Sequence, residues 1–135
     1  LAETAAPVEP LAMADAVAAA LGFLDQPYVW GGRGGTGIDC SGLIQRSLAA
    51  IGIATPRDSD MQMEALGTEP AEGASMQSGD LVFFPGHVGM MVDAEQLIHA
   101  TQNPGRVVIE PLADVIARVS KDHESPVLVH KRISR

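Results

Sequence analysis

Apolar residues recur at helical spacing through much of the first half of the chain. Residues 11–24 are rich in Ala and Leu and meet a helix stop signal at Gly22. Residues 41–51 place their apolar side chains on one helical face. A further helix is expected to begin around Asp58, just after Pro56. The first half is therefore predicted to be mainly helical.

The second half instead contains short runs of branched and aromatic residues bounded by Gly, Pro, Asp and Asn, a pattern typical of strands. The expected strands are residues 80–84, 87–92, 96–101, 106–110 and 127–133. One more helix is expected at residues 111–119, with Pro111 in its first turn. Helices followed by mostly neighbouring strands indicate an α+β fold with an antiparallel sheet.

Cys40 stands between a glycine-rich segment, residues 31–37, and the helix expected at 41–51. Five glycines in seven residues predict a tight loop. At the start of the helix, free N–H groups and the helix dipole favour the thiolate, which is the nucleophilic form of cysteine. The alternative is a small buried apolar residue, as most free cysteines are. The polar neighbours Asp39 and Ser41 make that alternative less attractive, but this segment alone leaves both open.

His87 opens one expected strand and His99 closes the next. A hairpin turning around Asp93 would pair the two histidines directly, with β-carbons about 5 Å apart on one face. A thiol, a histidine beside it and a third group that orients the ring are the parts of a nucleophilic catalytic site. Taken singly, each histidine is more often structural. His123 and His130 gain no such support and are interpreted as surface or strand-edge residues.

Composition narrows the function classes. The chain has 135 residues, 46% of them hydrophobic, which suits one domain, taken as residues 11–135, after a linker or trimmed segment at 1–10. A formal net charge of −8 argues against nucleic acid as partner. The single cysteine excludes an intrachain disulfide framework and a multi-cysteine metal site. No apolar run is long enough to cross a membrane.

Six short motifs now complete a resemblance. They are PYVWGG (27–32), GIDCSG (37–42), PRDSDMQ (56–62), GDLVFF (79–84), GHVGMMV (86–92) and LIHA (97–100). In this order they resemble the NlpC-type papain-like cell-wall peptidases, the NlpC/P60 family. The resemblance implies a papain-like fold in which N-terminal helices pack on a central antiparallel β-sheet and the nucleophile lies at a helix N-terminus.

The resemblance also implies roles for individual residues. The catalytic trio would be Cys40, His87 and His99. Tyr28 would place its hydroxyl near the reacting carbonyl, and Trp30 would form a wall of the cleft. The substrate's amine and D-glutamate would be bound with the help of Asp39, Ser41 and the Arg57–Asp58–Ser59 element, in which Ser59 and Asp58 face the substrate.

The WGGR and GIDCSG motifs are most similar to γ-D-glutamyl-L-diamino-acid endopeptidases. These act on peptidoglycan stem peptides such as L-Ala-γ-D-Glu-meso-diaminopimelate and need no metal or organic cofactor. In that subset an upstream SH3-like domain often restricts the pocket to free N-terminal L-Ala, so such a domain is a candidate partner. The periplasm or cell surface is the expected location, with cytoplasmic wall recycling as the alternative.

Three other functions stay open. An acyltransferase or amidase on the same fold would use the same nucleophile with a different acceptor. A zinc hydrolase could use Cys40, His87 and His99 as metal ligands. A wall-binding module could retain the fold without catalysis.

Overall fold

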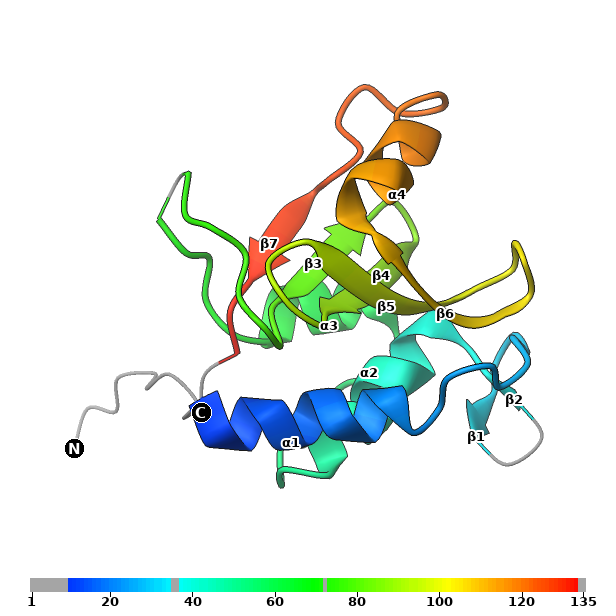
Figure 1. The fold of residues 1–135 in the computed structure, drawn as a ribbon, viewed down its shortest axis with the longest axis vertical. Coiled ribbons are helices and arrows are strands. Elements are labelled where there is room, and N and C mark those ends of the chain that lie inside the picture. Colours follow the sequence, from blue (N-terminus) through cyan, green and yellow to red (C-terminus); the bar gives the residue numbers. More distant parts are fainter. Residues whose placement is uncertain (1–9, 35–36, 72, 134–135) are drawn as a thin grey trace.

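The computed structural model describes residues 10–34, 37–71 and 73–133 (Figure 1). The helices are α1 (Pro10–Leu21), α2 (Cys40–Ala49), α3 (Ser59–Ala65) and α4 (Leu112–Val119). The strands are β1 (Arg33–Gly34), β2 (Gly37–Ile38), β3 (Leu81–Phe84), β4 (His87–Met91), β5 (Gln96–Thr101), β6 (Arg106–Pro111) and β7 (Val129–Lys131). The linker expected at residues 1–10 falls almost entirely outside the described residues.

The five longer strands form one sheet in the order β6-β5-β4-β3-β7. Every neighbouring pair in this sheet is antiparallel. The short strands β1 and β2 form a separate antiparallel pair within the glycine-rich segment that was expected to be a loop. The predicted α+β fold with helices on a central antiparallel sheet is confirmed.

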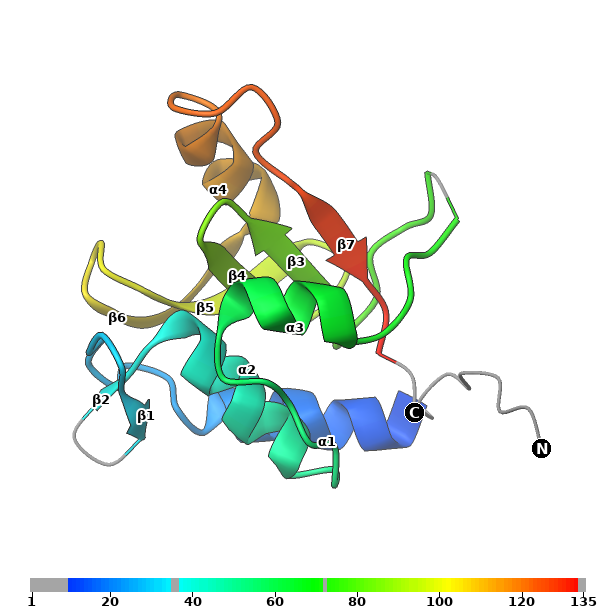
Figure 2. The same cartoon turned by 180° about the vertical axis from the view of Figure 1, so that it is seen from behind.

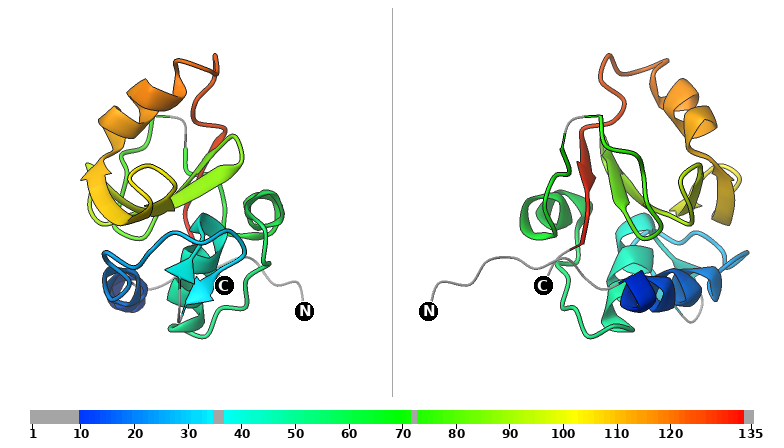
Figure 3. Two further views of the ribbon diagram at one scale, coloured as in Figure 1. Left: turned by 90° about the vertical axis from the view of Figure 1, so that its right-hand side faces the viewer. Right: turned by 60° about the vertical axis from the view of Figure 1, so that its left-hand side comes forward.

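The sheet buries both faces because successive side chains along a strand point to opposite sides. On β3, Leu81 and Phe83 pack with α1 and α2, whereas Val82 and Phe84 pack with α4. Figure 3 shows the sheet lying between the α1–α2 pair and α4. This sandwich explains why the burial of β3 is continuous rather than alternating.

Helix α2 is the element that carries the candidate nucleophile to the sheet. Its apolar face, which includes Leu43, Ile44 and Leu48, is fully buried with α1 and the sheet. Helix α3 lies on the side of the molecule turned to the viewer in Figure 2. None of the described helices has the length and apolar character needed to span a membrane.

The predicted hairpin register is wrong by two residues. In the structure Met90 pairs with Ile98 and Met91 with Leu97, so the turn does not centre on Asp93. The Asp93 carboxylate accepts the N–H groups of Glu95 and Gln96, each at 2.8 Å. Asp93 therefore begins the turn instead of occupying its middle.

Candidate active site

Asp39 organises the start of α2. It is the N-cap residue, and its Oδ1 accepts the Gly42 N–H at 2.7 Å. Its Oδ2 accepts the Gly31 N–H at 3.1 Å, which ties the glycine-rich segment to the helix. A Cβ at Gly42 would lie 2.6 Å from the Gly32 carbonyl oxygen. The close approach of loop and helix thus depends on glycine at that position.

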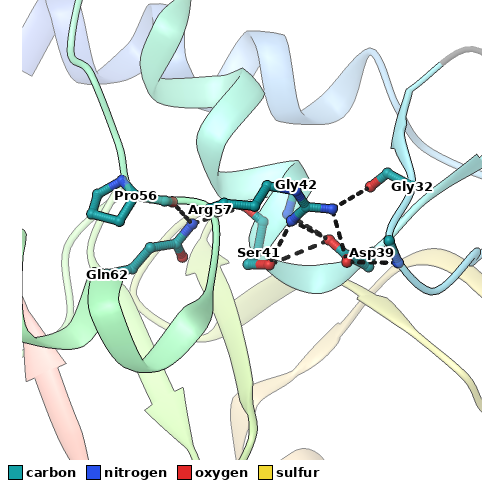
Figure 4. Close-up of polar contacts among 8 residues, drawn as sticks. Gly32, Asp39, Ser41, Gly42, Pro56, Arg57 and Gln62 are labelled. Carbon is teal, nitrogen blue, oxygen red and sulfur yellow. Dashed lines mark hydrogen bonds and ion pairs between the residues drawn. The ribbon is translucent and has the colours of Figure 1, made fainter.

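Arg57 bridges this helix start to the segment ahead of α3 (Figure 4). Its Nη1 donates to Asp39 Oδ1 at 3.0 Å and to Ser41 Oγ at 2.9 Å. Its Nη2 donates to Asp39 Oδ2 at 3.0 Å and to the Gly32 carbonyl at 3.2 Å. The Asp39–Arg57 pair is therefore bidentate, the most specific geometry for a guanidinium and a carboxylate.

The pKa of Asp39 is lowered by this network. Burial by itself would raise it, but the hydrogen bond from Arg57, the Gly42 N–H and the guanidinium charge outweigh burial. The carboxylate is ionised and both of its oxygens already have partners. The geometry gives Asp39 a structural task, and the role expected for it in holding a substrate amine stays a prediction.

A cleft of about 640 Å³ opens above the start of α2. Seven of the expected site residues line it: Trp30, Asp39, Cys40, Ser41, Arg57, Asp58 and Ser59. Trp30 stands at its edge with 81% of its surface exposed. Asp58, the N-cap residue of α3, makes no capping hydrogen bond with its side chain. These residues surround one cleft with an apolar edge and an acidic side, whereas Tyr28, His87 and His99 are not among its lining residues.

Cys40 is the first residue of α2 and meets the sheet at the start of β4. Burial raises the pKa of its thiol and the nearby Asp39 charge raises it further, against hydrogen bonds from the N–H groups of Val88, Ser41 and Cys40 itself. The helix start was expected to lower this pKa, and burial reverses that expectation. The direction of this shift favours the protonated thiol over the thiolate. Val88, whose N–H contacts the sulfur, directly follows His87 in the sequence.

His87 and His99 contact each other across β4 and β5. Nε2 of His87 lies 2.7 Å from Nδ1 of His99, and the ring planes are 66° apart. Burial, together with the His99 charge, lowers the pKa of His87 to about 3. Burial also lowers the pKa of His99, although Glu110 opposes that shift. Both rings are thus neutral at physiological pH, as a general base and its orienting partner must be.

Two residues that sequence reasoning missed lie behind His99. Nε2 of His99 is 2.6 Å from Oε2 of Glu110, and Arg118 donates to both oxygens of Glu110 at 2.7 Å. Arg118 lowers the pKa of Glu110, so this carboxylate is ionised. Glu110 lies on β6 and Arg118 on α4, and no motif marks either residue; only the strand pairing of β5 with β6 could have indicated Glu110.

Tyr28 is half-buried. Its pKa is raised by burial and then by the charges of Cys40 and Asp39, which places its hydroxyl within electrostatic reach of both. A hydrogen bond with the Gln102 side chain acts in the opposite direction. The phenol is therefore a neutral hydrogen-bond donor.

A zinc site would need at least three ligands converging on one point. Within residues 10–34, 37–71 and 73–133, no group of three His, Cys, Asp or Glu side chains is arranged to hold a metal ion. The Cys40–His87–His99 zinc alternative has no support in this geometry.

Comparison with known proteins agrees with the fold and the motifs. Residues 25–123 match the NlpC/P60 family. The chain is 35% identical over 96 residues to dipeptidyl-peptidase 6 of Lysinibacillus sphaericus, a match covering 71% of this chain and 35% of that protein. It is 34% identical over 102 residues to γ-D-glutamyl-L-lysine dipeptidyl-peptidase of Bacillus subtilis, covering 70% of this chain and 34% of that protein.

Among solved structures, the peptidoglycan hydrolase RipB of Mycobacterium tuberculosis superimposes with a TM-score of 0.72 at 28% identity. That match covers 93% of this chain and 66% of the RipB chain. The chain spans about a third of the length of the two curated relatives. On the family match and the shared fold, this chain belongs to the NlpC/P60 family.

Proposed function

We propose that the domain is a cysteine peptidase that hydrolyses peptidoglycan stem peptides at the bond between γ-D-glutamate and the diamino acid. The observation that carries the proposal is one cleft with Cys40 at the head of α2, beside the strand that begins with His87. The paired imidazoles of His87 and His99 add a base and an orienting group. The names of the Bacillus subtilis relative and of RipB agree with this reaction and substrate class.

In the proposed mechanism, His87 accepts the Cys40 thiol proton as the sulfur attacks the γ-glutamyl carbonyl carbon. The C–S bond forms and the carbonyl π electrons move to oxygen. The Cys40 N–H and the Tyr28 hydroxyl stabilise that oxyanion, and one such donor is worth about 3 kcal/mol. The C–N bond then breaks, and the amine leaves with the proton from His87.

Water completes the cycle. His87 removes a proton from a water molecule as its oxygen attacks the thioester. The C–S bond breaks, the thiolate regains the proton, and the dipeptide acid leaves. No metal or organic cofactor takes part in the proposed steps.

The cleft residues suggest how a stem peptide is held. Asp58 lines the cleft and makes no capping hydrogen bond, so we assign it to a substrate ammonium group. Ser41 and Ser59 also line the cleft, and the Ser59 hydroxyl is a donor for the α-carboxylate of D-glutamate. Trp30 offers an apolar surface at the edge. Asp39 and Arg57 hold Ser41 in place from behind.

We place the reaction at the cell wall, outside the cytoplasmic membrane, because peptidoglycan is the substrate proposed. Both curated relatives are named dipeptidyl-peptidases, which release a dipeptide and so act on a free N-terminus. In this domain, a requirement for a free N-terminal amine would follow from binding of that amine by Asp58. An SH3-like domain upstream is the proposed partner for that selectivity.

The function is tested by mass analysis of products from defined peptides. Incubation with L-Ala-γ-D-Glu-meso-diaminopimelate is expected to release L-Ala-D-Glu and free diaminopimelate. Blocking the N-terminal amine by acetylation separates dipeptidyl-peptidase from endopeptidase selectivity. A parallel reaction with an added amine acceptor tests the acyltransferase alternative, since transfer would yield an amide of the dipeptide. Intact peptides in all three reactions would reject the proposal.

A further inference from the structure

His87, His99 and Glu110 form a continuous polar chain across three neighbouring strands. In the β5–β6 register His99 pairs with Val108, so Glu110 is its diagonal neighbour. Continuing the β4–β5 register places His87 diagonal to His99 on the other side. The two contacts along this diagonal measure 2.7 Å and 2.6 Å.

Glu110, the last member of this series of polar contacts, is held by Arg118. Arg118, from α4, donates one N–H to each oxygen of Glu110 at 2.7 Å. The His99 side chain is 2% exposed, that of Glu110 is 19% exposed and that of Arg118 is 46% exposed. These contacts therefore lead from the half-buried His87 through the buried His99 and the half-buried Glu110 to a guanidinium at the surface.

Hydrogen-bonding capacity fixes the positions of the protons. An ionised carboxylate only accepts, so the proton in the His99–Glu110 contact belongs to Nε2 of His99. A neutral imidazole carries one proton, which leaves Nδ1 of His99 as an acceptor. The proton in the His87–His99 contact then belongs to Nε2 of His87. By the same rule, Nδ1 of His87 carries the free lone pair.

We propose that Glu110, held by Arg118, is a positioning residue that fixes Nε2–H on both His99 and His87 and so leaves Nδ1 of His87 as the basic nitrogen. The catalytic consequence rests on the proposed function, because it requires His87 to act as the base. The assignment of protons to the imidazole nitrogens does not depend on the proposed function. The titratable and charged groups that act on the two imidazoles are each other, Glu110 on β6 and Arg118 on α4.

The proton positions are measured directly on the wild-type protein without substrate. In ¹⁵N-imidazole-labelled protein at pH 7, both histidines are expected to be protonated at Nε2 and unprotonated at Nδ1. His99 protonated at Nδ1 would overturn the proposal. Because no peptide is added, this result stands apart from any failure of the proposed peptidase activity.

Variants separate positioning from a purely structural role. The amide in Glu110→Gln can donate as well as accept, so this variant is expected to admit the Nδ1–H form of His99. Its kcat/KM is expected to fall about tenfold to a hundredfold. That loss is smaller than the roughly 10⁴-fold loss seen when the carboxylate next to a catalytic histidine is replaced. Glu110→Asp retains the charge and should restore the Nε2–H form, with activity between the two. Glu95→Gln removes an exposed carboxylate at the β4–β5 turn and serves as the matched control. Unchanged histidine spectra in folded Glu110→Gln would contradict the proposal. If that variant does not fold, the ¹⁵N spectrum of the wild-type protein still shows whether Nε2 or Nδ1 of each histidine carries the proton.

Discussion

Nε2 of His87 lies 2.7 Å from Nδ1 of His99 although the two residues are not directly opposite each other in the sheet. The register is offset by two residues from direct pairing, and an even offset keeps both side chains on one face. Diagonal neighbours are within reach when both side chains are long or aromatic. The two imidazoles are therefore in contact, as the sequence predicted, but as diagonal neighbours and not as a directly opposed pair.

Replacing His99 is expected to reduce catalysis less than replacing His87. His99→Ala removes the acceptor that orients His87, and kcat/KM should fall about tenfold to a hundredfold. His87→Ala removes the base and should lower kcat/KM by about 10³-fold or more. His123→Ala, at an exposed position, is the control and should match the wild type. Wild-type kcat/KM in His99→Ala would remove the orienting role.

The pH dependence of thiol alkylation should report a protonated thiol. Burial raises the pKa of Cys40, so the iodoacetamide rate constant is expected to keep rising with pH above the range in which an ordinary cysteine has ionised. The same protein unfolded in urea should follow the ordinary titration curve. A rate constant in the folded protein that levels off below pH 8 would indicate a preformed thiolate and contradict this prediction.

Gly42→Ala is expected to destabilise the fold although alanine is the better helix former by about 1 kcal/mol. The new Cβ would lie 2.6 Å from the Gly32 carbonyl oxygen and 2.9 Å from Asp39 Oδ1, both held by the network around Arg57. Overpacking of this kind typically costs about 1–3 kcal/mol. Chemical denaturation measures the difference. Gly22→Ala, at an exposed site, is the control and should change the free energy of unfolding by less than about 1 kcal/mol.

Stability should fall on mild acidification. The pKa of His87 is about 3 in the folded state against 6.5 as the ordinary value, so between these limits the unfolded chain binds more protons. The contribution of His87 to the free energy of unfolding is therefore fully present above pH 6.5 and is lost progressively as the pH falls toward 3. From pH 7 to pH 5 the half-buried His87 should account for about 1–2 kcal/mol of that loss. His99, whose pKa is also lowered, acts in the same direction.

Urea denaturation at pH 7 and pH 5 measures this loss. His87→Gln should show a smaller difference between the two pH values than the wild type, because it lacks the titrating ring. Equal free energies of unfolding for the wild type at both pH values would contradict the lowered pKa.

The spacing of apolar residues predicted most of the helices and strands, because it reflects which face of each element is buried. The helix expected at residues 41–51 is observed at Cys40–Ala49, and the strand expected at 96–101 has those bounds. The burial of α2 follows its apolar face, and α3 begins directly after Asp58, where a helix was expected to begin. Boundaries moved by one to three residues where caps and turns, rather than hydrophobicity, decide the end of an element.

Long-range polar contacts could not be predicted in this way. The task of Asp39 depends on Arg57, eighteen residues later, and that of Glu110 depends on the pairing of β5 with β6. A single charged residue on a strand gives no periodic signal, so Glu110 is indistinguishable from a solvent-exposed acid in the sequence. The raised pKa of Cys40 also follows from burial by distant segments.

The role of Cys40 as nucleophile is tested by comparing cleavage of L-Ala-γ-D-Glu-meso-diaminopimelate by Cys40→Ala, by the wild type and by His123→Ala. Cys40→Ala is expected to fold, melt cooperatively and release no diaminopimelate, while His123→Ala is expected to match the wild-type rate. Release of diaminopimelate by folded Cys40→Ala at the wild-type rate would exclude Cys40 as the nucleophile.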